Sequence, residues 1–196
     1  VFLDNHVEFV KHFLKGQIAM EDVRRELMAQ AAKMERTGLP LTHVDSHQHM
    51  HMLPGVIDIS LDVAASLHLD AVRISRTPLF TAFAGMGQLI GRLGLFTLSE
   101  LSLWKAKRRH FRVPDHFEGI VAGEAVHEGH FLHILKDLRP GTTEVMMHPG
   151  TDNSRLIPAC DWEHDFEAEM QAIVSPKVRR MITDKAVKIV NYRDLK

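Results

Sequence analysis

The sequence predicts an α/β domain with a mainly parallel sheet. Its 196 residues are 45% apolar and 25% charged, the proportions of a globular protein with a core. Short runs rich in β-branched residues alternate along the chain with longer helical patterns. This alternation is typical of βα units, whose strands pair in parallel. The length fits one domain over residues 1–196.

The clearest helix is expected over residues 20–37. Its apolar residues recur every three or four positions, which places them on one face. These residues are Met20, Val23, Leu27, Ala31 and Met34. Gly38 follows, and glycine is the usual residue just beyond a helix end.

The remaining elements follow from the same two patterns. Strands are expected at Leu41–His47, Ala71–Ser75, Phe117–Ala122, Thr143–His148 and Val187–Asn191. Helices are expected at about 55–68, 97–110, 124–138, 161–174 and 177–185. Functional residues of α/β domains collect where parallel strands end, so the ends of these runs are the places to search.

The first expected strand ends in a histidine-rich segment. Ionisable residues occupy every second position there: His43, Asp45, His47, His49 and His51. In an extended chain such residues share one face, so Asp45 and His47 are expected to project together. Imidazole and carboxylate groups suit a divalent metal or a proton-transfer site. Because one ion cannot take all five, we expect most of them, including His49 and His51, to contact substrate or support the ligands.

His148 ends a second strand, immediately before Pro149 and Gly150. Histidine is the side chain best suited to exchange protons near neutral pH, so His148 is a candidate general acid or base. A purely structural histidine is the alternative.

Arg73 lies inside an otherwise apolar expected strand, and Arg76 follows at its end. A buried guanidinium requires a partner, which could be a catalytic carboxylate or a structural ion pair. We treat both arginines as candidate substrate contacts.

Other features restrict the class of protein. Near-neutral net charge (−1) argues against a nucleic-acid surface. The stretch 78–112 is apolar and then basic, which predicts a flap that could touch a lipid surface, but its charges and glycines argue against a membrane span. The lone Cys160 is expected to be a bystander and fits a cytoplasmic location.

These residues resemble the YdjC-like carbohydrate deacetylases. The resemblance rests on the segment His43–His51 with Leu53 and Pro54 after it, and on two further segments, Ala71–Ile74 and Glu144–Pro149. The best-known member type of this family is the chitooligosaccharide deacetylase. The flap and the Pro114–Phe117 segment resemble the branch associated with hopanoid biosynthesis.

The resemblance implies an incomplete (β/α) barrel of the NodB polysaccharide-deacetylase type. It implies a hydrolase that uses a divalent metal (Mg or Zn) and water to remove N-acetyl groups from amino sugars. It implies that His47 is a metal ligand. It also implies that His148 either protonates the leaving group or contacts the substrate. We add Asp45 as a catalytic candidate.

The family's opening Asp-Asp-Phe-Gly strand and its later Gly-x-His segment do not occur in this chain. We therefore expect the N-terminal strands, with two metal ligands and the usual base, to be absent. An exposed sheet edge would then favour a homo-oligomer such as a dimer. Two alternatives stay open: a silent module that binds a sugar or lipid-linked glycan, and a different metallohydrolase such as a phosphoesterase.

Overall fold

The computed structural model describes residues 5–76, 86–120, 125–160 and 162–195, and the side chains of 86–92 are left out of the description. The chain divides into two compact units, which are residues 1–113 with 191–196, and residues 114–190. Each unit is described by itself, and the expectation of one domain stays a prediction. Both units are mostly helical, and the described sheet has two parallel strands.

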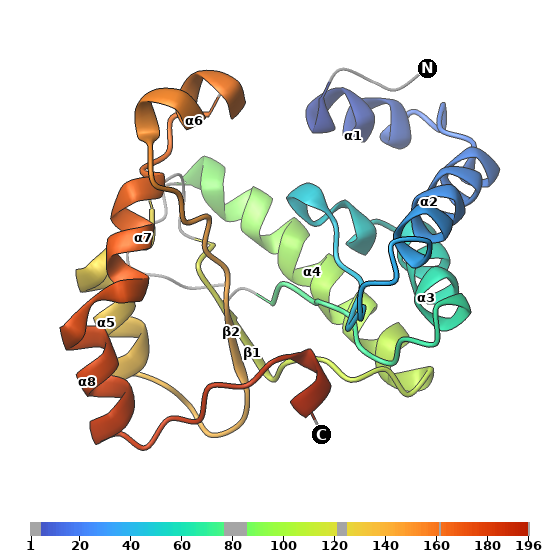
Figure 1. Ribbon diagram of the computed structural model, residues 1–196. Coiled ribbons are helices and arrows are strands. Elements are labelled where there is room, and N and C mark those ends of the chain that lie inside the picture. The colour runs from blue at the N-terminus through green and yellow to red at the C-terminus, as the bar shows by residue number, and fades with distance from the viewer. Residues whose placement is uncertain (1–4, 77–85, 121–124, 161, 196) are drawn as a thin grey trace. The chain divides into compact units, whose positions relative to one another are not determined.

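The first unit contains α1 (His6–Leu14), α2 (Met20–Glu35), a 3₁₀ segment η1 (His47–Met52), α3 (Val56–Ser66), α4 (Met86–Arg108) and η2 (Tyr192–Asp194). The helix expected at 20–37 is confirmed as α2, and its apolar face packs on Ile59 and Val63 of α3. Met34 is the exception, because it is 43% exposed. Figure 1 shows α2 running along α3.

The core of this unit joins α3, α4 and the expected strands. Its buried members are Met52, Ile57, Leu61, Ala64, Val72, Ile74, Ala106 and Phe111. The strands expected at 41–47 and 71–75 pair in parallel, but only at the single bridge Val44–Val72. The first is short because the chain leaves the extended conformation after Ser46 and enters η1.

The second unit contains β1 (His116–Glu118), α5 (Glu128–Lys136), β2 (Thr143–Val145), α6 (Asn153–Cys160), α7 (Phe166–Val174) and α8 (Pro176–Asp184). Phe117 pairs with Glu144 in the parallel register of β1 and β2. Helices α5, α7 and α8 pack together beside this strand pair (Figure 1).

Three further expected elements differ from the structure. No strand forms at 187–191 within the described chain, because Ala186 turns the backbone (φ 51°) and the apolar run that follows leaves Ile189 77% exposed. The helix expected at 161–174 begins only at Phe166, where the Asp165 side chain accepts a hydrogen bond from the amide of Ala168. The helix expected at 97–110 begins earlier, at Met86.

The flap predicted at 78–112 lies partly outside the described residues, which resume at Met86. Its described part is helix α4 and the turn that follows. Among the described residues, no helix has the length and apolar character needed to cross a membrane.

Glu118 of β1 has a partly buried carboxyl group that affects how the stability of the protein depends on pH. Burial raises the pKa of its carboxyl group, an effect that nearby Arg139, His116 and His133 oppose. A pKa that is higher in the folded than in the unfolded chain means that stability falls as the pH rises through the folded value. We therefore expect Glu118→Gln to raise the melting temperature at pH 7 and to leave it nearly unchanged at about pH 3.5.

The ion pair with Arg139 is too weak to reverse this result, because it is 3.8 Å long and the Arg139 side chain is exposed. Glu163→Gln, at an exposed carboxylate of the same unit, is the matched control. A lower melting temperature for Glu118→Gln at pH 7 would contradict the claim that burial raises the pKa of Glu118.

Candidate functional site

The histidine-rich segment begins beside a second extended segment. The amide of Val44 donates to the carbonyl of Ala71, and the amide of Arg73 donates to the carbonyl of Val44. This pairing places the Arg73 guanidinium 2.5 Å from a carboxylate oxygen of Asp45. The partner expected for Arg73 is therefore Asp45, one of the candidate catalytic residues.

The segment then turns sharply instead of continuing as a strand. Gln48 and His49 both have left-handed backbones, with φ of 52° and 57°. Such conformations cost about 1 kcal/mol or more each for residues other than glycine, and they persist where surrounding contacts enforce them. Here Nδ1 of His49 lies 2.8 Å from the hydroxyl of buried Ser75. The local strain and this contact give the loop a fixed shape.

His51 anchors the same loop from inside. It is 2% exposed, its Nε2 donates to the carbonyl of Arg73 at 2.7 Å, and its Nδ1 lies 2.9 Å from the Ser46 hydroxyl. Burial lowers the pKa of His51, which favours the neutral ring that this bonding pattern requires. A substrate contact through His51 would have to break one of these bonds.

His47 differs from its neighbours because its side chain is exposed. Among the described residues, its ring makes no hydrogen bond that would compete with a ligand. The backbone on both sides is held by Ser46 and His51, since the Ser46 hydroxyl accepts from the His51 amide at 2.8 Å. His47 is thus an available imidazole on a fixed loop.

Arg76 pairs with Glu100 of α4 at 2.7 Å, and both side chains are 39% exposed. The pair is accessible enough for a substrate to compete for the guanidinium. Its predicted role in substrate binding stays a prediction.

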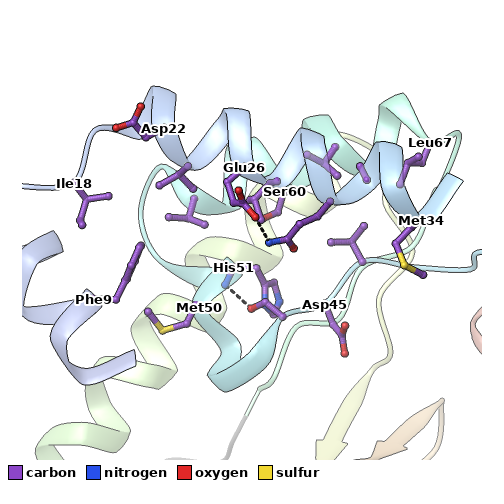
Figure 2. Close-up of a pocket in the computed structure, with 18 of the residues that line it drawn as sticks. Phe9, Ile18, Asp22, Glu26, Met34, Asp45, Met50, His51, Ser60 and Leu67 are labelled. Atoms are coloured by element: carbon purple, nitrogen blue, oxygen red, sulfur yellow. Dashed lines mark hydrogen bonds between the residues drawn. The ribbon is translucent and has the colours of Figure 1, made fainter. Parts of the chain in front are cut away.

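A cavity of about 910 Å³ adjoins the histidine-rich loop within the first unit. Its wall is mostly apolar and comes from α1, α2 and α3, with Asp45 and His51 among its polar lining residues (Figure 2). The cavity therefore offers apolar contact area next to the Asp45–Arg73 pair.

The second unit carries a separate cluster where β2 ends. His148 follows β2 after two residues, and the chain turns at Gly150, whose amide donates to the carbonyl of Phe166. A side chain at Gly150 would collide with Leu156 and would place its Cβ 2.9 Å from that of Phe166. Glycine is required here for the close approach of the turn to α7.

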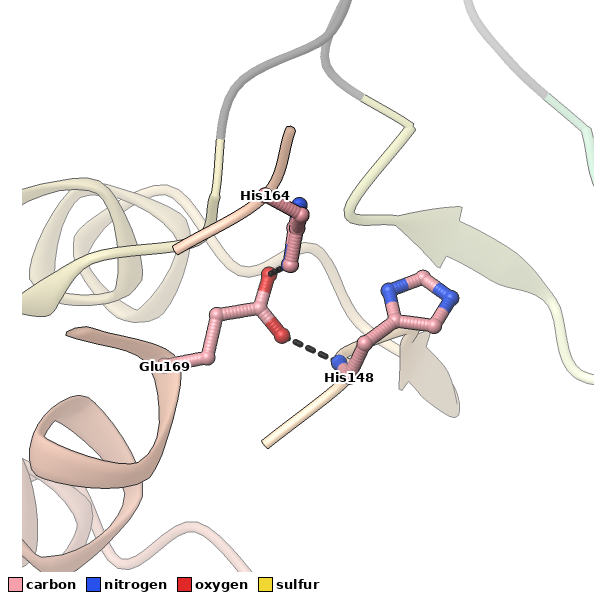
Figure 3. Close-up of side chains that lie close together, drawn as sticks. All are labelled: His148, His164 and Glu169. Carbon is pink, nitrogen blue, oxygen red and sulfur yellow. Dashed lines mark hydrogen bonds and ion pairs between the residues drawn. The ribbon is translucent and has the colours of Figure 1, made fainter. Parts of the chain in front are cut away.

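Glu169 of α7 fixes the position of His148. Its side chain is buried, one oxygen accepts from the Val126 amide at 2.9 Å, and the other accepts from the His148 amide. The first oxygen also lies 3.2 Å from Nε2 of His164 (Figure 3). The carboxylate therefore connects α7 with two loops and with a buried imidazole.

These three side chains also satisfy the chemistry of a metal site. Their donor atoms all lie within 4.8 Å of one another, and His164 and Glu169 are buried while His148 is the most accessible. Within the described chain, neither ring nitrogen of His164 makes a hydrogen bond. Two imidazoles and a carboxylate fit a divalent cation such as zinc. The carboxylate, however, is already engaged by two backbone amides.

Sequence reasoning identified His148 but missed His164, Glu169 and Trp162. A buried glutamate has no distinctive pattern, because Glu167 and Glu169 are both polar residues in the first turn of a helix. The signal that was available is the alternation of Trp162, His164 and Phe166, which places one histidine between two aromatic residues.

Three further histidines, His127, His130 and His133, lie at α5. His127 caps this helix by accepting from the His130 amide, and His133 is 71% exposed beside Asp137.

The similarity of this chain to known proteins extends over both histidine segments. A carbohydrate deacetylase of Mus musculus is 28% identical over 205 residues, covering 92% of this chain and 64% of that protein. A carbohydrate deacetylase of Thermoanaerobacter pseudethanolicus is 27% identical, covering 90% of this chain and 61% of that protein. A third, from Homo sapiens, is 28% identical with coverages of 92% and 61%.

The chain thus spans less than two thirds of the length of these relatives. The model of one family, described as YdjC-like protein, matches residues 2–184, which include the histidine-rich loop and the His148 cluster. The chain belongs to the YdjC-like protein family.

Proposed function

We propose that this protein hydrolyses the N-acetyl group of an amino sugar or of an oligosaccharide that contains one. The observation that carries the proposal is the similarity to proteins named carbohydrate deacetylases, which extends over about nine tenths of the chain. The position of His148 at the end of β2, with its backbone held by Glu169, supports the same reading. Removal of an acetyl group requires a proton for the departing amine, and an accessible imidazole can supply it.

Three groups have roles in this proposal. His148 donates the proton to the departing amine. Asp45 and Arg73 form an ion pair that orients the Asp45 carboxylate beside the histidine-rich loop. His49 and Arg76 are the proposed substrate contacts.

His47 is the proposed ligand of a divalent metal, because its ring is exposed on a fixed loop. When bound, such an ion supplies Lewis acidity for the amide carbonyl. We assign Glu169 and His164 the role of positioning His148 instead of binding metal, because the Glu169 carboxylate already accepts from two backbone amides. The finer reading of the fold, an incomplete (β/α) barrel, and the cytoplasmic location also belong to this proposal.

Metal binding tests the assignment of His47. In titration calorimetry with Zn²⁺ or Mn²⁺, we expect His47→Ala to weaken binding at least about tenfold, because an imidazole ligand is lost. His164→Ala removes an imidazole of the cluster in the second unit, whose ring nitrogens make no hydrogen bond within the described chain. We expect this variant to bind the metal with an affinity near that of the unmodified protein.

The opposite pattern would contradict this assignment. If His164→Ala abolished metal binding and His47→Ala did not, the cluster in the second unit would be the metal site. His133→Ala, at an exposed histidine of α5, controls for nonspecific binding to surface imidazoles.

A further inference from the structure

Four rings, those of His148, Trp162, His164 and Phe166, gather in the second unit. Trp162 stacks on His164, with ring centroids 4.1 Å apart and ring planes at 22°. The His148 ring is nearly perpendicular to both, at 5.0 Å from Trp162 and 5.4 Å from His164. Because His148 is about equally far from both stacked rings, it lies beside the stack and not on top of it.

Phe166 has a similar relation to the stack. Its ring lies 5.7 Å from Trp162 and 4.9 Å from His164, again at steep angles. The two remaining rings therefore border the stack, and none of the described rings covers the face of Trp162 that is turned away from His164.

Trp162 is also the more exposed member of the stack. The residue is 38% exposed, whereas His164 behind it is 6% exposed. The indole consequently has a buried imidazole as backing on one face and no described ring on the other, and it lies beside the proposed proton donor. The backing restricts rotation of the indole, so a ligand stacked on it would lose little binding energy to ordering the ring.

We propose that Trp162 is a stacking platform for the pyranose ring of the N-acetylated sugar, holding it next to His148. The C–H groups on one face of a pyranose are apolar and carry partial positive charge, which suits the negative face of an indole. A free amine on the sugar would be protonated and would also be attracted to this face. The inference rests on the proposed function and names Trp162 as the determinant of sugar binding.

The two tryptophans of the chain, Trp104 and Trp162, make the platform directly measurable. In Trp104→Phe, indole fluorescence reports on Trp162 alone, and we expect a saturable change on titration with N,N′-diacetylchitobiose. In titration calorimetry with the same sugar, Trp162→Ala should raise Kd about tenfold. Trp162→Phe retains a ring and should recover most of the affinity.

Trp104→Ala is the matched control, since this residue lies on α4 in the other unit and is 53% exposed. It should leave Kd unchanged. Melting temperatures of all variants establish that loss of binding is not loss of folding. The platform is overturned if the Trp104→Phe signal does not respond to the sugar, or if Trp162→Ala and Trp104→Ala bind it equally.

The outcomes separate this inference from the proposed function. If the sugar binds in a way that depends on Trp162 but no acetate is released, the stacking role of Trp162 is supported and the deacetylase function is contradicted. If Trp162→Ala releases acetate with the KM and Kd of the unmodified protein, the stacking role of Trp162 is contradicted and the deacetylase function is supported.

Discussion

Replacing Glu169 with alanine is expected to lower the free energy of unfolding by about 3–5 kcal/mol. The side chain is 1% exposed, and its carboxylate accepts from the amides of Val126 and His148. Its removal leaves one buried and one partly buried donor without their acceptor, which costs about 1–3 kcal/mol for the buried one and less for the other. It also leaves the buried ring of His164 without the carboxylate that lies 3.2 Å away.

Urea unfolding followed by far-UV circular dichroism measures this loss. Glu163→Ala, at an exposed glutamate of the same segment, should change stability by no more than about 0.5 kcal/mol. Glu169→Gln keeps one acceptor oxygen and should fall between the two. A loss below about 1 kcal/mol for Glu169→Ala would show that the carboxylate does not hold the two loops together.

Replacing His148 with alanine is expected to reduce kcat for deacetylation by a factor of about 10² to 10⁴. The amine of an amide is a poor leaving group unless it is protonated, and His148 is the accessible member of its cluster. Because the Glu169 contact is made by the backbone of His148, the alanine variant keeps that hydrogen bond and should remain folded.

The assay is acetate release under saturating substrate, with the melting temperature measured in parallel. His133→Ala, which removes an exposed imidazole from the same unit, should leave kcat unchanged. A His148→Ala variant with full kcat and an altered KM would move this residue from proton donation to substrate contact.

The sequence predicted those parts of the fold in which local pattern and packing agree. The 3.6-residue apolar period of α2 gave the correct face, because that face packs against Ile59 and Val63. The run at Val187–Val190 is rich in β-branched residues but forms no strand. Strand pairing depends on a neighbouring strand edge, which the local sequence does not specify.

The candidate site shows the same division. Its exposed or strand-end residues, such as His47 and His148, are visible as a pattern of ionisable residues where strands end. Glu169 and His164 come from α7 and the segment before it, and they reach His148 only through the turn at Gly150. A contact across 21 residues, such as Glu169 to His148, cannot be recognised from spacing alone.

The central claim is that the protein removes acetyl groups from nitrogen on a sugar. The most direct measurement is the release of acetate from N,N′-diacetylchitobiose, with Zn²⁺ or Mg²⁺ supplied and the free amine quantified in parallel. We predict equal amounts of acetate and amine, and sharply reduced amounts of both with His148→Ala. Absence of acetate while the sugar still binds, or release of phosphate from a phosphoester in its place, would contradict the account.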